Sequence, residues 1–425
     1  MAGRKSYFAW HSWIGLTCGL MLFVICWSGT IAVFAHEIDW LLNPDMRVPR
    51  FDGALPWQAA HDAVRAAYPD WKIVEIAAPR YPGFAMEVLA QPEPDNSFRI
   101  YVDPHTAQIL GDSSYFNVQR FFRSFHMALF QPDWVQIAGI PIGYFTVIIF
   151  TVPLIASLVT SLVFYKRWWR GFWKLERRRG AKIFWSDVHK LTGVWSLWFI
   201  GIISLTCIWY FAEWYLPYRD EPAATATIEA PPLPVSQLVA RAEVAFPQLN
   251  ITAVSLYSAD NHMIHVIGSD GTMLVRPAAS VALDMRSGAV LDIYRPASEG
   301  VLARLTETAD VLHFGTFAGL WSQLLYFLFG LALSAMILTG AYLHAKRQQR
   351  QRTRDRNIPV LTAYTITVAL LLMAAVAGWT EVRSYGLNGE WPPVPWQVTV
   401  AISLWVLTTL AGLTWWAKTL LRTDH

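Results

Sequence analysis

Residues 11–16 of this chain read HSWIGL, and residues 189–194 read HKLTGV. In both stretches a histidine is followed, after three residues, by a glycine and then by an aliphatic residue, and both stretches open a long apolar run. A histidine at the edge of such a run can bind a metal while its backbone stays helical. The repeated stretch therefore predicts two equivalent membrane-spanning helices, each with a histidine at the same membrane face.

The composition indicates a chain that crosses a membrane several times. Of 425 residues, 54% are apolar and only 15% are charged, and the mean hydropathy is +0.31. A helix needs about 20 apolar residues to cross a bilayer. Six runs reach that length, over residues 11–35, 137–165, 188–214, 318–344, 360–380 and 396–417. We therefore expect a polytopic α-helical membrane protein with six spans.

Charge and cysteine usage exclude several function classes. The net charge of +3 is small and locally clustered, so we expect no nucleic-acid partner. Cys18, Cys26 and Cys207 all fall within apolar runs, which argues against a disulfide framework and a cysteine-based metal site. The sequence contains no glycine-rich phosphate loop, nucleophile elbow or His-Glu-x-x-His motif.

Basic residues predict the orientation. They cluster at Arg4 and Lys5, in the links over residues 166–182 and 346–356, and at Lys418 and Arg422. Such clusters stay on the cytoplasmic side, so both termini are expected there. We interpret the first apolar run as a retained helix rather than a cleaved signal, because it is long enough to span.

Two longer polar segments, residues 36–133 and 215–317, are expected on the opposite side. Each begins with a helix-like stretch (57–68 and 235–246) and continues with alternating strand-like runs. Each ends in a strand–turn–strand unit, built on Asp103 and Asp284. A unit of helix, small α+β domain and helix is thus used twice, which predicts a parallel repeat about an axis along the membrane normal.

This organisation divides the chain into six parts. They are the first span (1–35), a first α+β domain (36–133), spans two and three with a basic link (134–214), a second α+β domain (215–317), span four (318–347), and spans five and six with their link (348–425). Spans five and six have no counterpart in the repeat, so we expect them to be an appendage.

Six histidines lie at the ends of the spans, in one group at each membrane face. The groups are His11, His189 and His344 on the cytoplasmic side, and His36, His126 and His313 on the other. A neutral imidazole offers one good lone pair to haem iron. Two imidazoles from facing helices would close both axial positions, which suits electron transfer rather than oxygen activation. We therefore predict two haem b groups, one in each tier.

The pairing within each tier stays open. The repeat makes His11 equivalent to His189, and His126 equivalent to His313, whereas Trp214 and Phe164 stand where partners of His36 and His344 would be. A helix from His11 to His36 would rise about 37 Å at 1.5 Å per residue, and so join both tiers. The alternative for any single histidine is an interfacial side chain bonded to lipid or backbone.

Three arginines near the outer histidines are candidate contacts for haem propionates or for an anionic ligand: Arg120, Arg123 and Arg304. Arginine pairs well with carboxylates because its planar guanidinium donates in a fork. Solvated surface charge is the alternative for all three.

These motifs resemble the PepSY-associated transmembrane (PiuB-like) family. The resemblance covers about residues 6–347 and is carried by residues 11–16, 36–39, 126, 189–195, 313–319 and 338–340, and by the turn units at Asp103 and Asp284. It implies haem-bearing reductases of the bacterial inner membrane, including FoxB-type ferrisiderophore reductases, with periplasmic PepSY-like domains. Two positions depart from the family pattern. Residues 342–344 stand where tryptophans are more usual, and Ala107 stands where glycine is usual.

The resemblance implies a dihaem b reductase. Electrons would enter from a cytoplasmic reductant or from membrane quinol, and would leave to a periplasmic ferric siderophore. Reduction to Fe(II) weakens chelation by hard oxygen ligands and releases the iron. Two other functions stay open: a PepSY-type binding or regulatory protein with incidental histidines, and a transporter whose halves rock around a midplane site.

Overall fold

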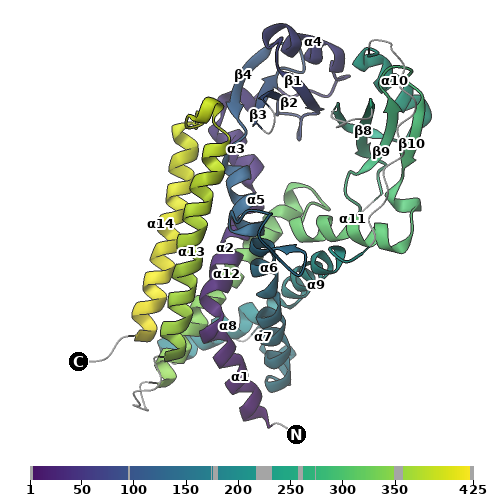
Figure 1. Ribbon diagram of the computed structural model, residues 1–425. Helices are drawn as coiled ribbons and strands as arrows, with labels where there is room; N and C mark the ends of the chain where they lie inside the picture. Colours follow the sequence, from purple (N-terminus) through teal and green to yellow (C-terminus); the bar gives the residue numbers. More distant parts are fainter. Residues whose placement is uncertain are drawn as a thin grey trace.

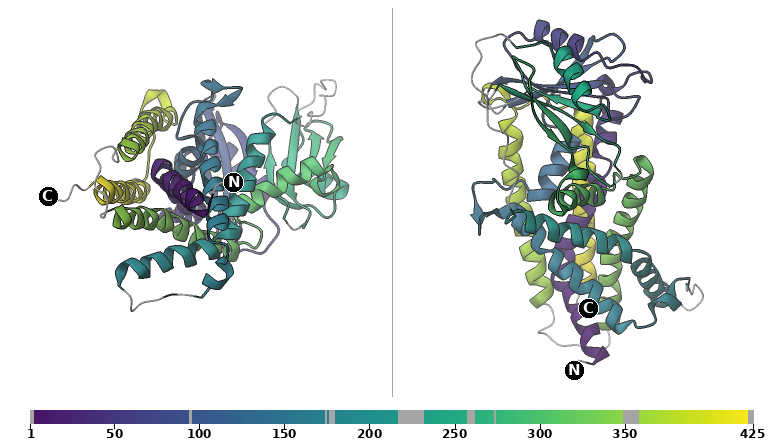
Figure 2. Two further views of the ribbon diagram at one scale, coloured as in Figure 1. Left: turned by 90° about the horizontal axis from the view of Figure 1, so that it is seen from below. Right: turned by 90° about the vertical axis from the view of Figure 1, so that its right-hand side faces the viewer.

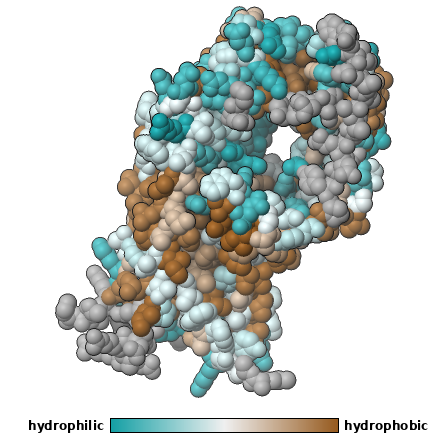
Figure 3. All heavy atoms as spheres, viewed as in Figure 1, coloured by the Kyte–Doolittle hydropathy of each residue, from teal (hydrophilic) through white to brown (hydrophobic). Residues whose placement is uncertain are grey.

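The computed structural model describes residues 3–93, 96–173, 175, 180–216, 232–256, 262–272, 274–348 and 358–421. A bundle of long helices forms one end of the molecule, and a β-sheet with two helices forms the other (Figure 1). Hydrophobic surface gathers on the bundle, whereas the sheet end is largely hydrophilic (Figure 3). Parts of both basic links, at residues 174, 176–179 and 349–357, lie outside the described residues.

Within the described residues, four continuous stretches of helix are long and apolar enough to cross a membrane. They are α6 (Ile142–Ile149) with α7 (Thr151–Phe164), α12 (Leu320–Gln348), α13 (Ile358–Ser384) and α14 (Trp396–Leu421). Two bent pairs qualify when each is counted as one span. They are α1 (Arg4–Thr17) with α2 (Gly19–Ala32), and α8 (Ala181–Trp195) with α9 (Leu197–Glu213). The chain is thus a helical protein with four to six candidate spans, located where hydropathy predicts them.

The bends correct the expectation of one straight helix from His11 to His36. The axes of α1 and α2 differ by 65°, and those of α8 and α9 by 55°. A second break at Phe34 separates α2 from α3 (Ala35–Leu42). Cys18 and Phe34 both have a φ of −111°, far from the value of about −63° in a regular helix. His11 and His36 therefore lie on different helices, and the distance of a straight rise does not apply.

Strands from both polar segments form one eight-stranded antiparallel sheet. The first segment contributes α4 (Trp57–Ala67), β1 (Lys72–Ala77), β2 (Met86–Glu93), β3 (Asn96–Val102) and β4 (Ile109–Ser114). The second contributes α10 (Val235–Ala245), β7 (Asn250–Ser255), β8 (Met263–Ser269), β9 (Ala279–Asp284) and β10 (Val290–Tyr294). The strand order is β10-β9-β8-β7-β1-β2-β3-β4, and the segments meet where Ile76 of β1 pairs with Val254 of β7.

Helices α4 and α10 cover the same face of this sheet, on the side away from the bundle (Figure 2). Their apolar sides, including Val64 and Leu238, pack on inward-facing strand residues such as Val88 and Val266. These strands alternate buried and more exposed positions, as expected of a sheet with one face packed on a core. One continuous core therefore runs across the junction between β1 and β7, so the two segments bury apolar surface together.

Two short helices lead from the sheet back into the bundle. They are α5 (Val118–Ala128) and α11 (Val301–Phe314), and a small hairpin of β5 (Gln136–Ile137) and β6 (Ile140–Pro141) follows α5. Asp39 of α3 accepts hydrogen bonds from the backbone N–H groups of Val118 and Gln119, both at 2.8 Å. Burial raises the pKa of Asp39 to about 7, and these two donors oppose that shift. Asp39 thus satisfies two of the free donors at the start of α5.

The two strand–turn–strand units have the same backbone. The Ala107 N–H donates to the Asp103 carbonyl and the Gly288 N–H to the Asp284 carbonyl, both at 2.8 Å. Ala107 has a φ of +56° and Gly288 a φ of +68°, so both occupy the left-handed region. Alanine thus adopts the conformation for which glycine is the usual residue, and the two turns share it.

This conformation predicts opposite effects of exchanging the two residue types. Ala107→Gly should stabilise the protein by roughly 0.5–1 kcal/mol, because a left-handed alanine is strained by more than the backbone entropy that glycine adds to the unfolded chain. Gly288→Ala should destabilise it by about 1–2 kcal/mol, since its Cβ would also lie 2.6 Å from Arg241 Nη1. Unfolding of the purified variants in detergent measures both changes. Equal stability of the two variants would contradict the prediction.

Candidate functional site

His126 and His313 meet at the sheet-side end of the bundle. His126 lies near the end of α5 and His313 near the end of α11, with ring centroids 6.3 Å apart and ring planes inclined by 40°. Two imidazoles that bind one metal from opposite sides, through bonds of about 2 Å, have centroids roughly 6–6.5 Å apart. The spacing of this outer pair therefore suits two ligands of one metal ion.

Each ring of the outer pair uses Nδ1 in a hydrogen bond with a hydroxyl of a spanning helix. His126 Nδ1 lies 3.0 Å from Ser28 Oγ of α2, and His313 Nδ1 lies 2.9 Å from Thr206 Oγ1 of α9. Both hydroxyls donate their own proton to a backbone carbonyl about one turn earlier, at 2.9 and 3.0 Å. They must therefore accept from Nδ1–H, which leaves the lone pair of the ring on Nε2.

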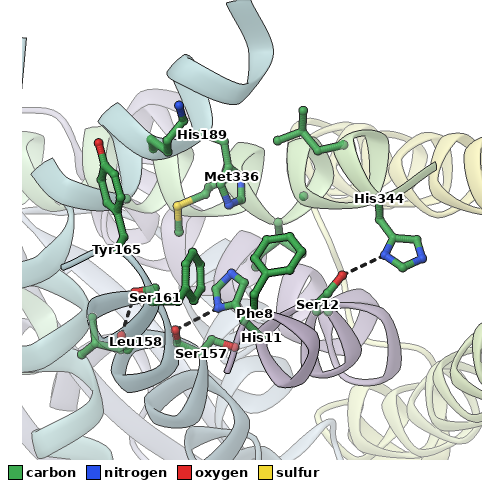
Figure 4. Close-up of a pocket in the computed structure, with 18 of the residues that line it drawn as sticks. Phe8, His11, Ser12, Ser157, Leu158, Ser161, Tyr165, His189, Met336 and His344 are labelled. Atoms are coloured by element: carbon green, nitrogen blue, oxygen red, sulfur yellow. Dashed lines mark hydrogen bonds between the residues drawn. The ribbon is translucent and has the colours of Figure 1, made fainter. Parts of the chain in front are cut away.

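At the opposite end of the bundle His11, His189 and His344 line one cavity of about 460 Å³ (Figure 4). They come from three helices, α1, α8 and α12. Most of the other lining side chains are aliphatic or aromatic, with contributions from all three helices and from α7. The volume falls within the range of about 300–1,000 Å³ that is usual for sites of small molecules and cofactors.

The inner histidines are held in the same way as the outer pair. His11 Nδ1 lies 3.0 Å from the Ser157 carbonyl oxygen, which accepts only, so Nδ1 carries the proton. His189 Nδ1 lies 3.1 Å from Thr339 Oγ1, whose own proton goes to the Met336 carbonyl at 3.0 Å. Both rings therefore present Nε2 with its lone pair. In the part of the chain that the structure describes, neither these Nε2 atoms nor those of the outer pair make a hydrogen bond.

His344 is tied to the helix that carries His11. Its Nδ1 lies 2.8 Å from Ser12 Oγ, and Ser12 follows His11 directly in α1 (Figure 4). This contact joins α12 to α1 beside the cavity. The structure thus gathers all three inner histidines at one site.

Three cationic side chains also line the inner cavity: Lys182, Lys190 and Arg347. Lys190 Nζ pairs with Asp187 at 2.7 Å. Arg347 donates to the Leu343 carbonyl at 3.0 Å, and its guanidinium lies 4.6 Å from the centre of the Phe8 ring. A largely apolar cavity with cationic residues in its wall suits a flat apolar molecule that bears acidic groups.

His36 belongs to a different helix from the outer pair. It lies on α3 beyond the end of the first span, and no ring contact joins it to His126 or His313 among the described residues. Burial, together with the nearby charges of Arg80, Arg99 and Arg123, lowers the pKa of His36 to about 3. His36 is therefore neutral near pH 7.

The three candidate arginines have different surroundings. Arg120 pairs with Glu381 at 3.1 Å, and its Nε donates to Tyr385 Oη at 2.7 Å. Arg123 on α5 and Arg304 on α11 are exposed. Arg120 is thus engaged within the protein, whereas Arg123 and Arg304 face outward.

The hydroxyl partners of the outer pair are candidate site residues that the sequence analysis missed. Ser28 follows His11 by 17 residues, and Thr206 follows His189 by the same 17 residues. Each hydroxyl supports the outer histidine of its own half of the chain. The signal that could have revealed them is a hydroxyl residue at the same distance in sequence from the first histidine of each of two apolar spans.

Metal ligation by the protein alone does not fit this arrangement. In the described ranges there is no group of three or more histidine, cysteine, aspartate or glutamate side chains that could hold a metal ion. Two imidazoles without a third protein ligand suit a metal that brings its remaining ligands in a cofactor. Imidazoles with the lone pair on Nε2 are side chains that a haem iron could take as its protein ligands.

Comparison with known families gives a match over most of the chain. The model of the PepSY-associated TM region matches residues 8–347, about four fifths of the sequence. This confirms the resemblance drawn from the histidine and turn motifs. The matched region contains all six histidines and ends before α13. No curated protein matches the chain.

The position of His126 predicts that the stability of the protein depends strongly on Gly29 of α2. A Cβ at this position would lie 2.7 Å from Cε1 of His126, so Gly29→Ala must displace the ring or the helix. We expect a loss of about 1–3 kcal/mol, the usual cost of overpacking. Gly201→Ala in α9 is the matched control, because nothing lies within 4 Å of its added Cβ. This control should be neutral or stabilising by up to about 1 kcal/mol. Unfolding in detergent tests both variants, and equal stability of the two would refute the close approach.

Proposed function

Because the chain belongs to the PepSY-associated TM region family, we propose that it is a transmembrane electron-transfer protein. It holds two haem b groups, one at the outer pair and one in the inner cavity, and reduces a ferric siderophore in the periplasm. The observation that carries the proposal is the geometry of the outer pair. Two imidazoles from separate helices stand 6.3 Å apart, and both have Nδ1 engaged and Nε2 free.

The ligand sets follow from the availability of Nε2. His126 and His313 hold the outer haem, and His11 and His189 hold the inner one. Bound haem would supply one-electron redox chemistry at each of these two histidine pairs. His344 stands third in the inner cavity, and its bond to Ser12 braces the helix that carries His11. Lys182, Lys190 and Arg347 are the candidate partners of the inner propionates.

The hydroxyls do the positioning. Ser28, Thr206 and Thr339 each accept the Nδ1 proton of a ligand histidine. This contact fixes the tautomer and the plane of the ring, and it raises the electron density on Nε2. Histidine rings held in this way would move little when the charge on a bound haem changes.

The orientation follows from the basic links. The inner cavity is on the cytoplasmic side, where a cytoplasmic reductant or membrane quinol delivers electrons, and the sheet is in the periplasm of a bacterium. The two polar segments form a pair of PepSY-like modules, and spans one to four form a parallel repeat. One electron reduces Fe(III) in the siderophore to Fe(II), which hard oxygen ligands bind less tightly.

A second candidate function has one observation in its favour. A cavity of about 620 Å³ lies between α4 and α10, on the side of the sheet away from the bundle. This location favours a binding or regulatory role for the sheet, without redox chemistry. A colourless protein that binds a partner through this cavity would support it.

The visible spectrum of the purified full-length protein tests the redox proposal. We expect a Soret peak, a sharp α band after dithionite, and two haems per chain in a pyridine haemochrome assay. His313→Ala and His126→Ala should each lower this ratio to one, because each removes an outer ligand only. His61→Ala, on α4 far from both tiers, should leave two. Wild-type protein without haem would overturn the proposal.

The hydrogen bond between Thr206 and His313 predicts an effect on the affinity for haem at the outer site. Thr206→Val keeps the size of the side chain but removes the acceptor of the His313 proton. We expect haem binding at the outer site to weaken by roughly 10–100-fold, the usual effect of losing such a contact. The inner haem should keep its midpoint potential. Titration of the apoprotein with haemin measures the affinity, and unchanged affinity would show that Thr206 has no such role.

A further inference from the structure

The last two spans lie beyond the matched residues 8–347, yet they contact the helix that carries His126. Helices α13 and α14 form a hairpin beside α2 and α5 (Figure 1). Their contacts with α5 join positions more than 250 residues apart in the chain. The family match therefore does not account for the contact between this hairpin and α5.

Glu381 of α13 is the centre of the polar contacts. Its Oε1 accepts a hydrogen bond from Ser124 Oγ at 2.6 Å and another from Tyr385 Oη at 2.8 Å. The same oxygen lies 3.1 Å from Nη2 of Arg120, whose Nε donates to Tyr385 Oη at 2.7 Å. Arg120 and Ser124 both belong to α5, six and two residues before His126. One carboxylate thus engages α5 at two points a turn apart.

An aromatic contact complements these bonds. Trp405 of α14 lies between 4.9 and 5.7 Å, centroid to centroid, from three rings of α5. These rings are Phe121, Phe122 and Phe125. Only 7% of Trp405 is exposed, so the indole is buried against α5. Aromatic pairs at such distances each contribute about 0.5–1.5 kcal/mol beyond the burial of their area.

The link between α13 and α14 is also fastened to the sheet. Asn96 Nδ2 of β3 donates to the Gly386 carbonyl at 3.0 Å, and Ser114 Oγ of β4 donates to the Pro393 carbonyl at 3.2 Å. Strand β4 leads directly into α5. The hairpin therefore restrains α5 along its length and also the strand that precedes it.

The equivalent helix α11 is held differently. Tyr210 of α9 donates to Asp310 at 2.8 Å, and Arg276 pairs with Glu307 at 2.8 Å and with Asp310 at 3.1 Å. These contacts come from the same half of the chain as α11. Helix α5 instead receives comparable contacts from spans outside the repeat. The two ligand-bearing helices thus have separate supports.

We propose that the hairpin of α13 and α14 is a clamp for α5, and that Glu381 is a positioning residue that fixes the His126 ring relative to His313. Its relevance to haem rests on the proposed function, whereas the restraint on α5 is a property of the chain itself. Loss of the Glu381 charge removes its ion pair with Arg120 and weakens its hydrogen bonds with Ser124 and Tyr385. Helix α5 then rotates more freely, and the angle between the two imidazole planes is no longer fixed.

The experiment compares Glu381→Gln with Glu390→Gln in the full-length protein as purified. Glu390 is exposed in the link of the same hairpin, so its variant makes the same change of charge away from α5. Hydrogen exchange followed by mass spectrometry reports on residues 118–128 and 301–314, whether or not haem is bound. The g values of the low-spin haem signals report on the imidazole planes. Tyr385→Phe is a second, milder variant that keeps the ring.

The proposal expects exchange of residues 118–128 to be several-fold faster in Glu381→Gln, with 301–314 unchanged and Glu390→Gln like wild type. Tyr385→Phe should show the same pattern to a smaller degree. With haem bound, the g values of one haem should move and those of the other should not. Exchange in Glu381→Gln equal to that in Glu390→Gln would overturn the clamp. Faster exchange with unmoved g values would overturn the positioning role. Wild-type protein without haem would contradict the proposed function. Hydrogen exchange of residues 118–128 would still test whether the hairpin restrains α5.

Discussion

The arrangement of this protein depends on one requirement, that each imidazole buried in the bundle finds an acceptor for its Nδ1 proton. An unpaired buried donor costs about 1–3 kcal/mol, and water is scarce among apolar spans. Four histidines meet this requirement through a hydroxyl or carbonyl of a neighbouring helix. The hydroxyls can accept because their own protons go to carbonyls in their own helices. The same bonds leave the lone pair of each of these rings on Nε2.

The sheet and the outer pair are connected by short structural links. Asp39 holds the start of α5, and His126 stands near its end, so the helix reaches from the sheet to the bundle within 11 residues. On the other half α11 plays the same part and ends at His313 and Phe314. Because β1 pairs with β7, both helices depend on one sheet. The separation of the two rings is thus set jointly by the sheet above and the spans below.

The two halves of the chain have equivalent hydroxyl–histidine hydrogen bonds, but α5 and α11 are held by different contacts. Ser28 and Thr206 stand at the same offset from His11 and His189, and each serves the outer histidine of its own half. The supports of α5 and α11 differ, because Glu381 and Trp405 come from spans beyond the family match. An appended hairpin therefore supports one of the two histidine-bearing helices, α5, through Glu381 and Trp405.

The sequence by itself determined the candidate spans, the strand-rich polar segments and the family. These follow from hydropathy, alternation and spacing, which are local patterns that depend little on the rest of the chain. Tertiary structure alone decided the bends at Cys18 and Ser196, the pairing of β1 with β7, and the left-handed Ala107. It also decided which hydroxyl meets which ring, and that Glu381 reaches α5. The reason is physical: a hydrogen bond between residues 98 to 257 positions apart is chosen by packing, and no local pattern encodes it.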